Sequence, residues 1–316
     1  MNAMQPETSP LPANLPGSPP APASAPSAAP CPDCAGKART SVSEQYVYAI
    51  GQLEVRFPSL GIEREYQQRE CALRESSGLA RGARICSVLE RNPHLAMRMS
   101  YIFLIDGMPA YAINPAGGFM KEALFEAVAR CDDQAHFCVL VGRTGTFAAA
   151  PAHGGLLLTT VSADQLYNFS LSEWVEGLTR SAQPVLESRK IDAAHFDAVA
   201  RNLFRDTSRT PENLGATEGH RALNYLLVQH PGIFLAAAER PGHQLASVET
   251  RVHQTVGGRR HVIVILAFVD RATGVAERLY CSVDVTEEWP FVVGTEASTS
   301  ALGLAPFVDS AMYAAG

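Results

Sequence analysis

The sequence has no apolar run long enough to cross a membrane. A spanning helix needs about 18 or more consecutive apolar residues, whereas the longest candidate, HVIVILAFV at 261–269, has the length of a strand. The N-terminus also lacks the basic segment followed by an apolar segment that marks a secretory signal. We therefore expect a cytoplasmic protein without a membrane partner.

Positive charge is also scarce. Lysine and arginine together number 26 against 32 for aspartate and glutamate, which gives a net charge of −6. Binding to a nucleic-acid backbone requires a concentrated basic surface, and the nearest approach, GGRRH at 257–261, has the glycine content of a hairpin turn. The composition therefore argues against nucleic acid as the main partner.

Cysteine is present, but not in the pattern of a disulfide framework. The seven cysteines are an odd number and are widely spaced. A chain of 316 residues with 47% hydrophobic residues can also form a core without cross-links. We expect most of these thiols to be reduced.

Two of the cysteines are close enough to share a ligand. Cys31 and Cys34, in the sequence CPDC, have the spacing of half a tetrahedral zinc site or of a redox pair. No second pair follows, so a structural zinc ion would need distant ligands, of which His153 is the first option. Further options are Cys71, Cys86 and Cys138. Inert thiols, a structural zinc and redox chemistry all remain open.

Residues 5–30 consist almost entirely of proline, alanine and serine. Proline fixes an extended path and removes backbone donors, while alanine and serine supply too little apolar surface for a core. We predict a disordered tail over residues 1–30, followed by one domain over residues 31–316.

The pattern of the domain predicts strands and helices in blocks. EQYVYAIGQLEV, from residue 44, reads as a strand, and Ser59 and Asp192 are predicted to cap the starts of helices. Asp106-Gly107 lies between two apolar runs, which predicts a hairpin whose second strand Pro109 places at an edge or starts late. Three β runs between 246 and 287 predict a meander. The expected fold is α+β with a mainly antiparallel sheet.

Polar residues cluster on one predicted helix, EGHRALNY at 218–225. His220, Arg221 and Asn224 on a single short helix can hold a substrate carboxylate or perform acid–base chemistry. Alternatively, these groups cap neighbouring loops. No catalytic motif is present that would decide between the two interpretations.

Carboxylates cluster where the last strand of the predicted meander ends, in DVTEEWPF at 284–291. Asp284, Glu287 and Glu288 can perform acid–base chemistry or bind a hard cation. Solvation or pairing with arginine is the other interpretation.

Several stretches, taken in order, resemble the C-terminal domain of the PatG-type cyanobactin maturation proteins. They begin with CPDCAG and YVYAIGQLEVRFPSLGIEREY. They continue with NPHLAMRMSYIFLIDGMPAYAINP, DQLYNFSLSEWVEGL and HRALNYLLVQHPGIF, and end with AERLYCSVDVTEEWPFVV. The resemblance spans about residues 31–295. It implies a role in the maturation of ribosomally made peptides, in a family where this domain follows a subtilisin-like protease and is described as of unknown function.

The chain also departs from that family. The 316 residues contain no counterpart of the protease motifs, so we expect the domain to be encoded alone and carry over no protease activity. The family pattern has cysteines near Ser100 and His153, which puts a shared metal site in doubt although His153 is still a zinc ligand type.

Two hypotheses of different classes follow from the resemblance and the polar clusters. In the first, the chain is an accessory or scaffold protein that can form a homodimer and that binds a precursor peptide or a processing enzyme. In the second, it is a peptide-modifying enzyme with a polar cleft around His220 and the Asp284–Glu288 segment. The second hypothesis requires these two segments to converge.

Overall fold

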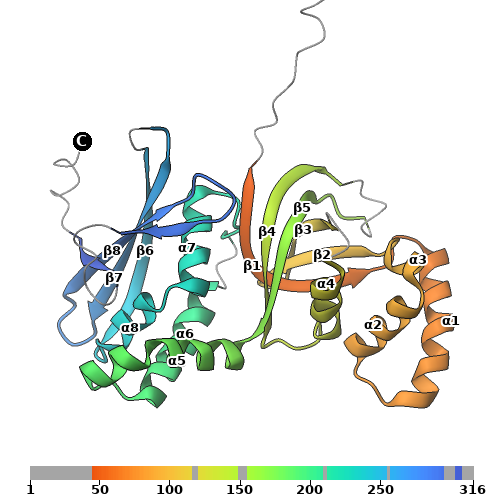
Figure 1. Cartoon of the computed structure of the whole chain (residues 1–316), viewed down its shortest axis with the longest axis horizontal. Helices are drawn as coiled ribbons and strands as arrows, with labels where there is room; N and C mark the ends of the chain where they lie inside the picture. The colour runs from red at the N-terminus through yellow and green to blue at the C-terminus, as the bar shows by residue number, and fades with distance from the viewer. Residues whose placement is uncertain are drawn as a thin grey trace, which may run out of the picture. The chain divides into compact units, whose positions relative to one another are not determined.

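The computed structural model describes residues 45–115, 120–148, 155–208, 212–254, 257–294 and 303–307. The predicted tail over residues 1–30, together with Cys31, Cys34 and His153, lies outside these residues. The described chain forms two halves, the barrel half over residues 45–170 and the C-terminal half from residue 171 onward (Figure 1).

The barrel half contains five strands and four helices. In chain order they are β1 (Tyr46–Arg56), α1 (Leu60–Ser77), α2 (Arg81–Arg91), α3 (Pro93–Ala96), β2 (Ser100–Ile105), β3 (Met108–Pro115), α4 (Met120–Ala129), β4 (His136–Phe147) and β5 (Thr159–Ser170). The strands close into a barrel in the order β1-β2-β3-β5-β4. All neighbours are antiparallel except β3 and β5, which are parallel.

Apolar side chains fill the inside of this barrel, among them Leu53, Phe103, Tyr111, Leu140 and Val161. Five-stranded Greek-key barrels of the OB-fold type bind ligands on the outer face of their second and third strands. Here Ala148 and Leu158 pack onto that face, against Ile102 and Ala112. Two residues of the chain itself therefore cover part of the surface that such barrels use for binding.

The hairpin predicted at Asp106-Gly107 joins β2 to β3, and both turn residues have positive φ, 48° and 74°. The prediction for Pro109 is wrong for the strand as a whole, because β3 begins at Met108 and pairs with both β2 and β5. At Pro109 itself only β2 is a partner, because the pairing with β5 begins at Tyr111, and proline is tolerated where one side of a strand is unpaired.

The C-terminal half combines four helices with the predicted meander. Its elements are α5 (Leu171–Arg189), α6 (Ala193–Ser208), α7 (Glu218–Gln229), α8 (Gly232–Ala238), β6 (His243–Gln254), β7 (Arg260–Asp270), β8 (Ala276–Asp284), β9 (Phe291–Val293) and β10 (Ala305–Pro306). The sheet order is β10-β8-β7-β6, with β9 also paired to β8. Strand β6 is hydrogen-bonded to β7 and, among the described strands, to no other.

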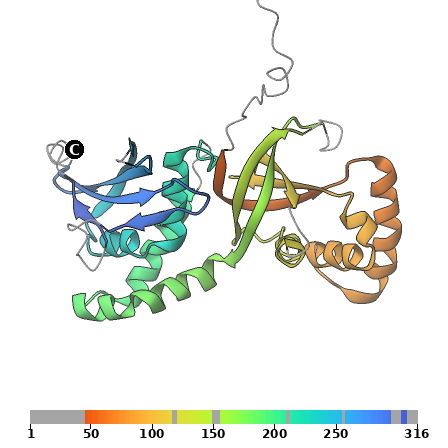
Figure 2. The same ribbon diagram turned by 45° about the horizontal axis from the view of Figure 1, so that its top comes forward.

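Strand β5 passes directly into α5 at Ser170–Leu171, which links the two halves (Figure 2). Ser170 accepts from the Glu173 backbone N–H at 3.1 Å, and the Glu173 carboxylate accepts from Ser170 Oγ at 2.8 Å. This is a capping box, and it starts the helix at the end of the strand.

One core spans both halves. Tyr48 and Ile50 on the outer face of β1 pack with residues of α5 to α8 and with Val264 and Val283 of the C-terminal sheet. The fold is therefore α+β with mainly antiparallel sheets, as the sequence predicts. No helix among the described residues is long and apolar enough to cross a membrane.

Candidate functional site

Arg221 lies where α7 meets the connection between β8 and β9. It is 4% exposed, and burial lowers the pKa of its guanidinium to about 10. Its terminal nitrogens donate to the carbonyl oxygens of Val285 and Glu288, both at 2.9 Å, and to that of Glu287. The structure thus brings Arg221 together with the predicted acidic segment. The contacts are with backbone oxygens, so this side chain fixes the path of the segment.

Asn224, one turn further along α7, holds the helix to the barrel. It is 1% exposed, and its Nδ2 donates to the Tyr48 carbonyl at 2.9 Å. Its Oδ1 accepts from Asn213 Nδ2 at 2.6 Å. Gly215 lies beside this contact with a φ of +74°, and a Cβ there would come within 2.5 Å of the Tyr48 oxygen. The Asn224 side chain therefore joins three closely packed segments, which are α7, β1 and the segment that precedes α7.

His220 does not join these contacts. It is half-buried, its Nδ1 has no hydrogen-bond partner, and burial lowers the pKa of its imidazole. The neutral ring is therefore the form present at neutral pH.

Asp284 is held by side chains of β7 and of the turn before it. Its Oδ2 accepts from Arg259 Nε at 2.5 Å and contacts His261 Nε2 at 3.1 Å, while Oδ1 accepts from the Thr286 N–H at 2.9 Å. The side chain is 2% exposed. Burial by itself raises the pKa of this carboxyl, but the hydrogen bonds from Arg259 and Thr286 lower it to about 2. Asp284 is thus a paired carboxylate.

Glu288 differs from Asp284 because it lies beside another acid. Burial, followed by the neighbouring Asp164 carboxylate, raises the pKa of Glu288. Arg143 of β4 reaches both acids, at 4.0 Å from Asp164 and 3.7 Å from Glu288. Among the six predicted catalytic candidates, Glu288 therefore combines a raised pKa with partial exposure.

A groove runs between α6 and the free edge of β6, away from all six predicted candidates. One part has a volume of about 670 Å³ and lies between α6 and the first half of β6, residues 243–248. A second part, of about 640 Å³, continues from it past His195 and Pro241 to the end of α5. We call the two parts together the α6–β6 groove.

The floor of the α6–β6 groove is apolar. Leu203 of α6, Leu223 of α7 and Leu245 and Val248 of β6 line it above Phe268. These residues belong to the core of the C-terminal half or pack against it. The floor therefore offers an apolar surface next to a strand edge.

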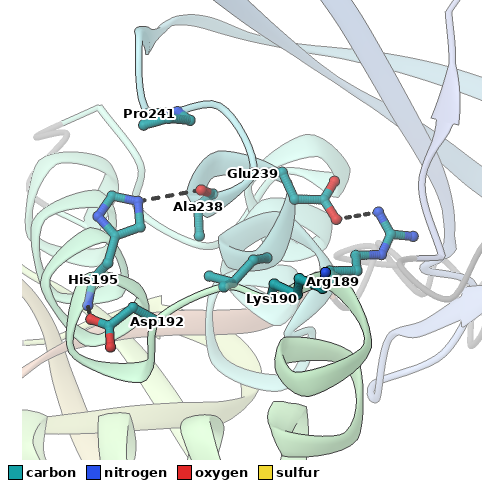
Figure 3. Close-up of a pocket in the computed structure, with 8 residues that line it drawn as sticks. Arg189, Lys190, Asp192, His195, Ala238, Glu239 and Pro241 are labelled. Carbon is teal, nitrogen blue, oxygen red and sulfur yellow. Dashed lines mark hydrogen bonds and ion pairs between the residues drawn. The ribbon is translucent and has the colours of Figure 1, made fainter.

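The second part of the groove is lined largely by charged and polar residues, whose apolar portions form most of its surface, and Figure 3 shows these residues. Asp192 accepts from the His195 N–H at 2.9 Å, which confirms its predicted role as a helix cap. His195 Nε2 lies 3.3 Å from the Ala238 carbonyl oxygen, and Glu239 pairs with Arg189. These pairs hold the ends of α5, α6 and α8 together around the groove.

No sequence pattern predicted this groove. Its residues come from four or more elements, and each has an ordinary local role as an apolar helix face or a strand residue. The one available signal was the position of the first strand of the predicted meander, because an outer strand of a sheet has an unpaired edge.

The described cysteines agree with the prediction of reduced thiols, since Cys71, Cys86, Cys131, Cys138 and Cys281 are free. Burial raises the pKa of Cys86 and Cys138 to about 12, so these thiols are inert. Within the described ranges, no group of three or more His, Cys, Asp or Glu side chains could hold a metal ion. The predicted ligands Cys31, Cys34 and His153 lie outside those ranges.

Comparison with known proteins agrees with the sequence resemblance. A family model described as "PatG Domain" matches residues 46–224, and one described as "PatG C-terminal" matches residues 190–298. A solved structure titled "PatG Domain of Unknown Function" is similar with a TM-score of 0.58 and 20% identity, over 79% of this chain and 97% of that one. At this identity the structural similarity shows a shared fold. No curated protein matches the chain.

Proposed function

Because the chain belongs to the PatG domain family, which indicates a role in the biosynthesis of cyanobactin-type ribosomal peptides, we propose that it is an accessory protein that binds an extended peptide in the α6–β6 groove. The peptide is a segment of a precursor peptide or of a processing enzyme. The observation that carries this proposal is the unpaired edge of β6 beside a groove with an apolar floor.

Strand addition explains how such a groove would work. An extended peptide hydrogen-bonds to a free strand edge, and its alternate side chains enter pockets beside that edge. Residues 243–248 of β6 supply the edge, and Leu203, Leu223 and Val248 supply an apolar surface for the side chains. The register shift between Leu245 and Ser247 distorts this edge, which disfavours unselective pairing with other strands.

A matched pair of substitutions on β6 tests the proposal. Val248 lines the groove, whereas Val252 lies on the same strand outside it and is 59% exposed. Peptides are first selected on the full chain from a display library of random linear sequences. We expect Val248→Lys to weaken the selected peptides by about tenfold or more, because an unpaired ammonium group would lie against the apolar floor, and Val252→Lys to change affinity by less than about twofold.

A second pair covers the case in which Val248→Lys does not fold. Asn202→Trp fills the groove from its exposed edge, and Arg205→Trp places the same ring on α6 outside the lining. Hydrogen exchange must also slow at the β6 amides when peptide binds. Peptides that bind both members of each pair equally, or a selection that yields no binder, would overturn the proposal.

The free edge also admits a second copy of the chain, since a strand edge can pair with its own copy. The homodimer is therefore the other occupant to test. Light scattering of the wild type and Asn202→Trp measures it. A dimer that Asn202→Trp dissociates would assign the groove to self-association and not to a peptide.

The peptide-modifying enzyme is the alternative function, and Glu288 is the observation that favours it. A carboxyl with a raised pKa beside Asp164 and Arg143 can act as a general acid. Mass spectrometry of a cyanobactin-type precursor peptide co-produced with the protein tests this function. A mass change that disappears in Glu288→Gln would support it, and an unchanged mass with the wild type would argue against it.

The zinc site of Cys31, Cys34 and His153 and the cytoplasmic location stay proposals that rest on the sequence. Metal analysis of purified protein tests the first. We expect Cys31→Ser to lower the zinc content, and an unchanged content would rule out Cys31 as a ligand.

A further inference from the structure

The hairpin of β6 and β7 places two histidines next to each other. In its antiparallel register His253 is directly opposite His261, and residues paired in this way point to the same face, with Cβ atoms about 4.5–5.5 Å apart. The preceding pair, Val252 and Val262, points to the opposite face, where Val262 belongs to the core. The two histidines therefore share the outer face of the C-terminal sheet, which is turned away from that core.

Strand β8 adds a carboxylate to the same row. Asp284 is directly opposite His261 on the other side of β7, and its Oδ2 lies 3.1 Å from His261 Nε2. An ionised carboxylate only accepts hydrogen bonds, so Nε2 carries the proton and donates it. In the neutral ring Nδ1 then keeps its lone pair.

This arrangement is the one that metal-binding histidines use. Such a histidine almost always donates its second ring N–H to a carboxylate or a carbonyl, which fixes the orientation of the ring and makes the other nitrogen more basic. No described residue forms a hydrogen bond with Nδ1 of His261. His261 is therefore oriented as a ligand whose remaining nitrogen is not used within the described part of the chain.

His253 is accessible as a second ligand. It is exposed, and its ring makes no hydrogen bond or ion pair with any residue that the structure describes. The side chain of His261 is 18% exposed. Solvent therefore reaches both rings of the pair.

The positive charges beside the pair are matched by carboxylates. Arg259 donates to Asp284 at 2.5 Å. Arg251 lies two residues before His253 on the same face and pairs with Glu249 at 3.4 Å. These two ion pairs leave no net positive charge that would repel a metal ion.

We propose that His253 and His261 together bind a divalent transition-metal ion, with water in the remaining coordination positions. Imidazole nitrogens are ligands of Zn²⁺, Ni²⁺ and Cu²⁺, whereas Mg²⁺ and Ca²⁺ prefer oxygen. Asp284 positions His261 and does not bind the ion, because its oxygens are taken by Arg259, His261 and Thr286. A site with two protein ligands is compatible with the absence of any three-residue metal group among the described residues.

The histidine pair is separate from the sites proposed above. The α6–β6 groove is lined by residues 243–248 of β6, and His253 lies further along that strand. The zinc proposal rests on Cys31, Cys34 and His153, which are not members of the pair. Each of these proposals can therefore fail without the others.

Calorimetric titration with Ni²⁺ tests the pair. The full chain carries Cys31→Ser and Cys34→Ser, which remove the thiols of the separate zinc proposal, and Ni²⁺ is chosen because it suits imidazole while thiolates favour softer ions. We expect saturable binding of one ion. His253→Gln should weaken this binding by about tenfold or more, because one of the two protein ligands is lost.

His94→Gln is the control for that substitution. His94 is 54% exposed and pairs with Glu65 at 2.8 Å, away from the hairpin. Its removal should change the affinity for Ni²⁺ by less than about twofold. Equal affinities of the parent chain and His253→Gln, or no saturable binding by the parent chain, would overturn the proposal.

A shift of one residue along β6 tests the geometry. Val252→His combined with His253→Gln keeps the number of histidines but turns the ring to the other face, because successive side chains of a strand alternate. We expect this double variant to bind Ni²⁺ no better than His253→Gln alone. Affinity restored to that of the parent chain would mean that the cross-strand pair is not the site.

Hydrogen exchange gives a readout that does not depend on affinity. An ion held by both strands opposes their separation, so Ni²⁺ should slow exchange at the amides around residues 253 and 261. His261→Gln removes the ring that Asp284 orients and should abolish the slowing. Slowing of the same size in His261→Gln would place the ion elsewhere and overturn the proposal.

Discussion

Helix α7 and strand β6 lie in the same half of the molecule and use their polar groups in opposite ways. On α7, Arg221 and Asn224 bind backbone carbonyls of two other segments, so their terminal nitrogens are used within the fold. Along β6, the outer edge has no partner strand in the described part of the chain. The polar residues that stand out in the sequence thus hold the structure together, whereas the hydrogen-bonding groups without a partner strand belong to a backbone edge that the sequence barely marks.

Removing the hydrogen bonds of Arg221 on α7 should lower the free energy of unfolding more than any other change considered below. Arg221→Met keeps the apolar stem but leaves the carbonyls of Val285, Glu287 and Glu288 without this donor. Each buried acceptor without a partner costs about 1–3 kcal/mol, so we expect the free energy of unfolding to fall by about 3 kcal/mol or more. Urea denaturation measures this change.

Arg260→Met is the matched control for that prediction. Arg260 is 54% exposed and pairs with Glu218 at 2.8 Å on the surface, and such pairs contribute about 0–1 kcal/mol. If the two substitutions have equal effects, Arg221 does not have the structural role that we assign to it, and a role at a binding or catalytic site becomes the better explanation.

The local features of the fold could be predicted from the sequence. The cap at Ser59, the turn at Asp106-Gly107 and the meander depend on residues close together in the chain, and the structure contains all three. Closure of the barrel could not be predicted, because the parallel pairing of β3 with β5 joins Tyr111 to Thr159, and no local pattern encodes a partner so distant in the chain.

The candidate site was predictable only in part. Only the enzyme hypothesis required α7 and the 284–288 segment to converge, and it could not tell that Arg221 meets carbonyl oxygens instead of the side chains of Glu287 and Glu288. That distinction depends on where a side chain is buried, which the tertiary packing decides. The α6–β6 groove gave even less signal, since a concave surface arises from how helices and a sheet pack.

The pH dependence of stability should show an effect of intermediate size at Asp284. Its pKa in the folded chain is about 2, below the ordinary value of about 3.9. A lowered carboxyl pKa stabilises the fold above the unfolded pKa, and this stabilisation is lost as the pH falls from about 4 to about 2. We expect this contribution to be about 2 kcal/mol in the wild type and absent in Asp284→Asn.

Denaturation series from pH 6 to pH 2 would measure that difference. Asp132→Asn is the control, because the Asp132 carboxylate pairs with Arg81 at 3.1 Å and is 45% exposed. Its profile should follow that of the wild type within about 0.5 kcal/mol. A wild-type profile that coincides with that of Asp284→Asn would mean that the Arg259 and Thr286 contacts do not stabilise the carboxylate.

The smallest expected change in the free energy of unfolding concerns two buried tyrosine hydroxyls. Tyr111 Oη donates to the Leu214 carbonyl at 2.8 Å, whereas Tyr48 Oη has no partner. Tyr111→Phe should therefore lower the free energy of unfolding by about 1 kcal/mol, while Tyr48→Phe should leave it unchanged or raise it by up to about 1 kcal/mol. Opposite signs for one chemical change would show that the Tyr48 hydroxyl is not needed for folding. A loss of stability in Tyr48→Phe equal to that in Tyr111→Phe would instead mean that the hydroxyl is hydrogen-bonded within the fold, with Gln229 as the neighbouring group.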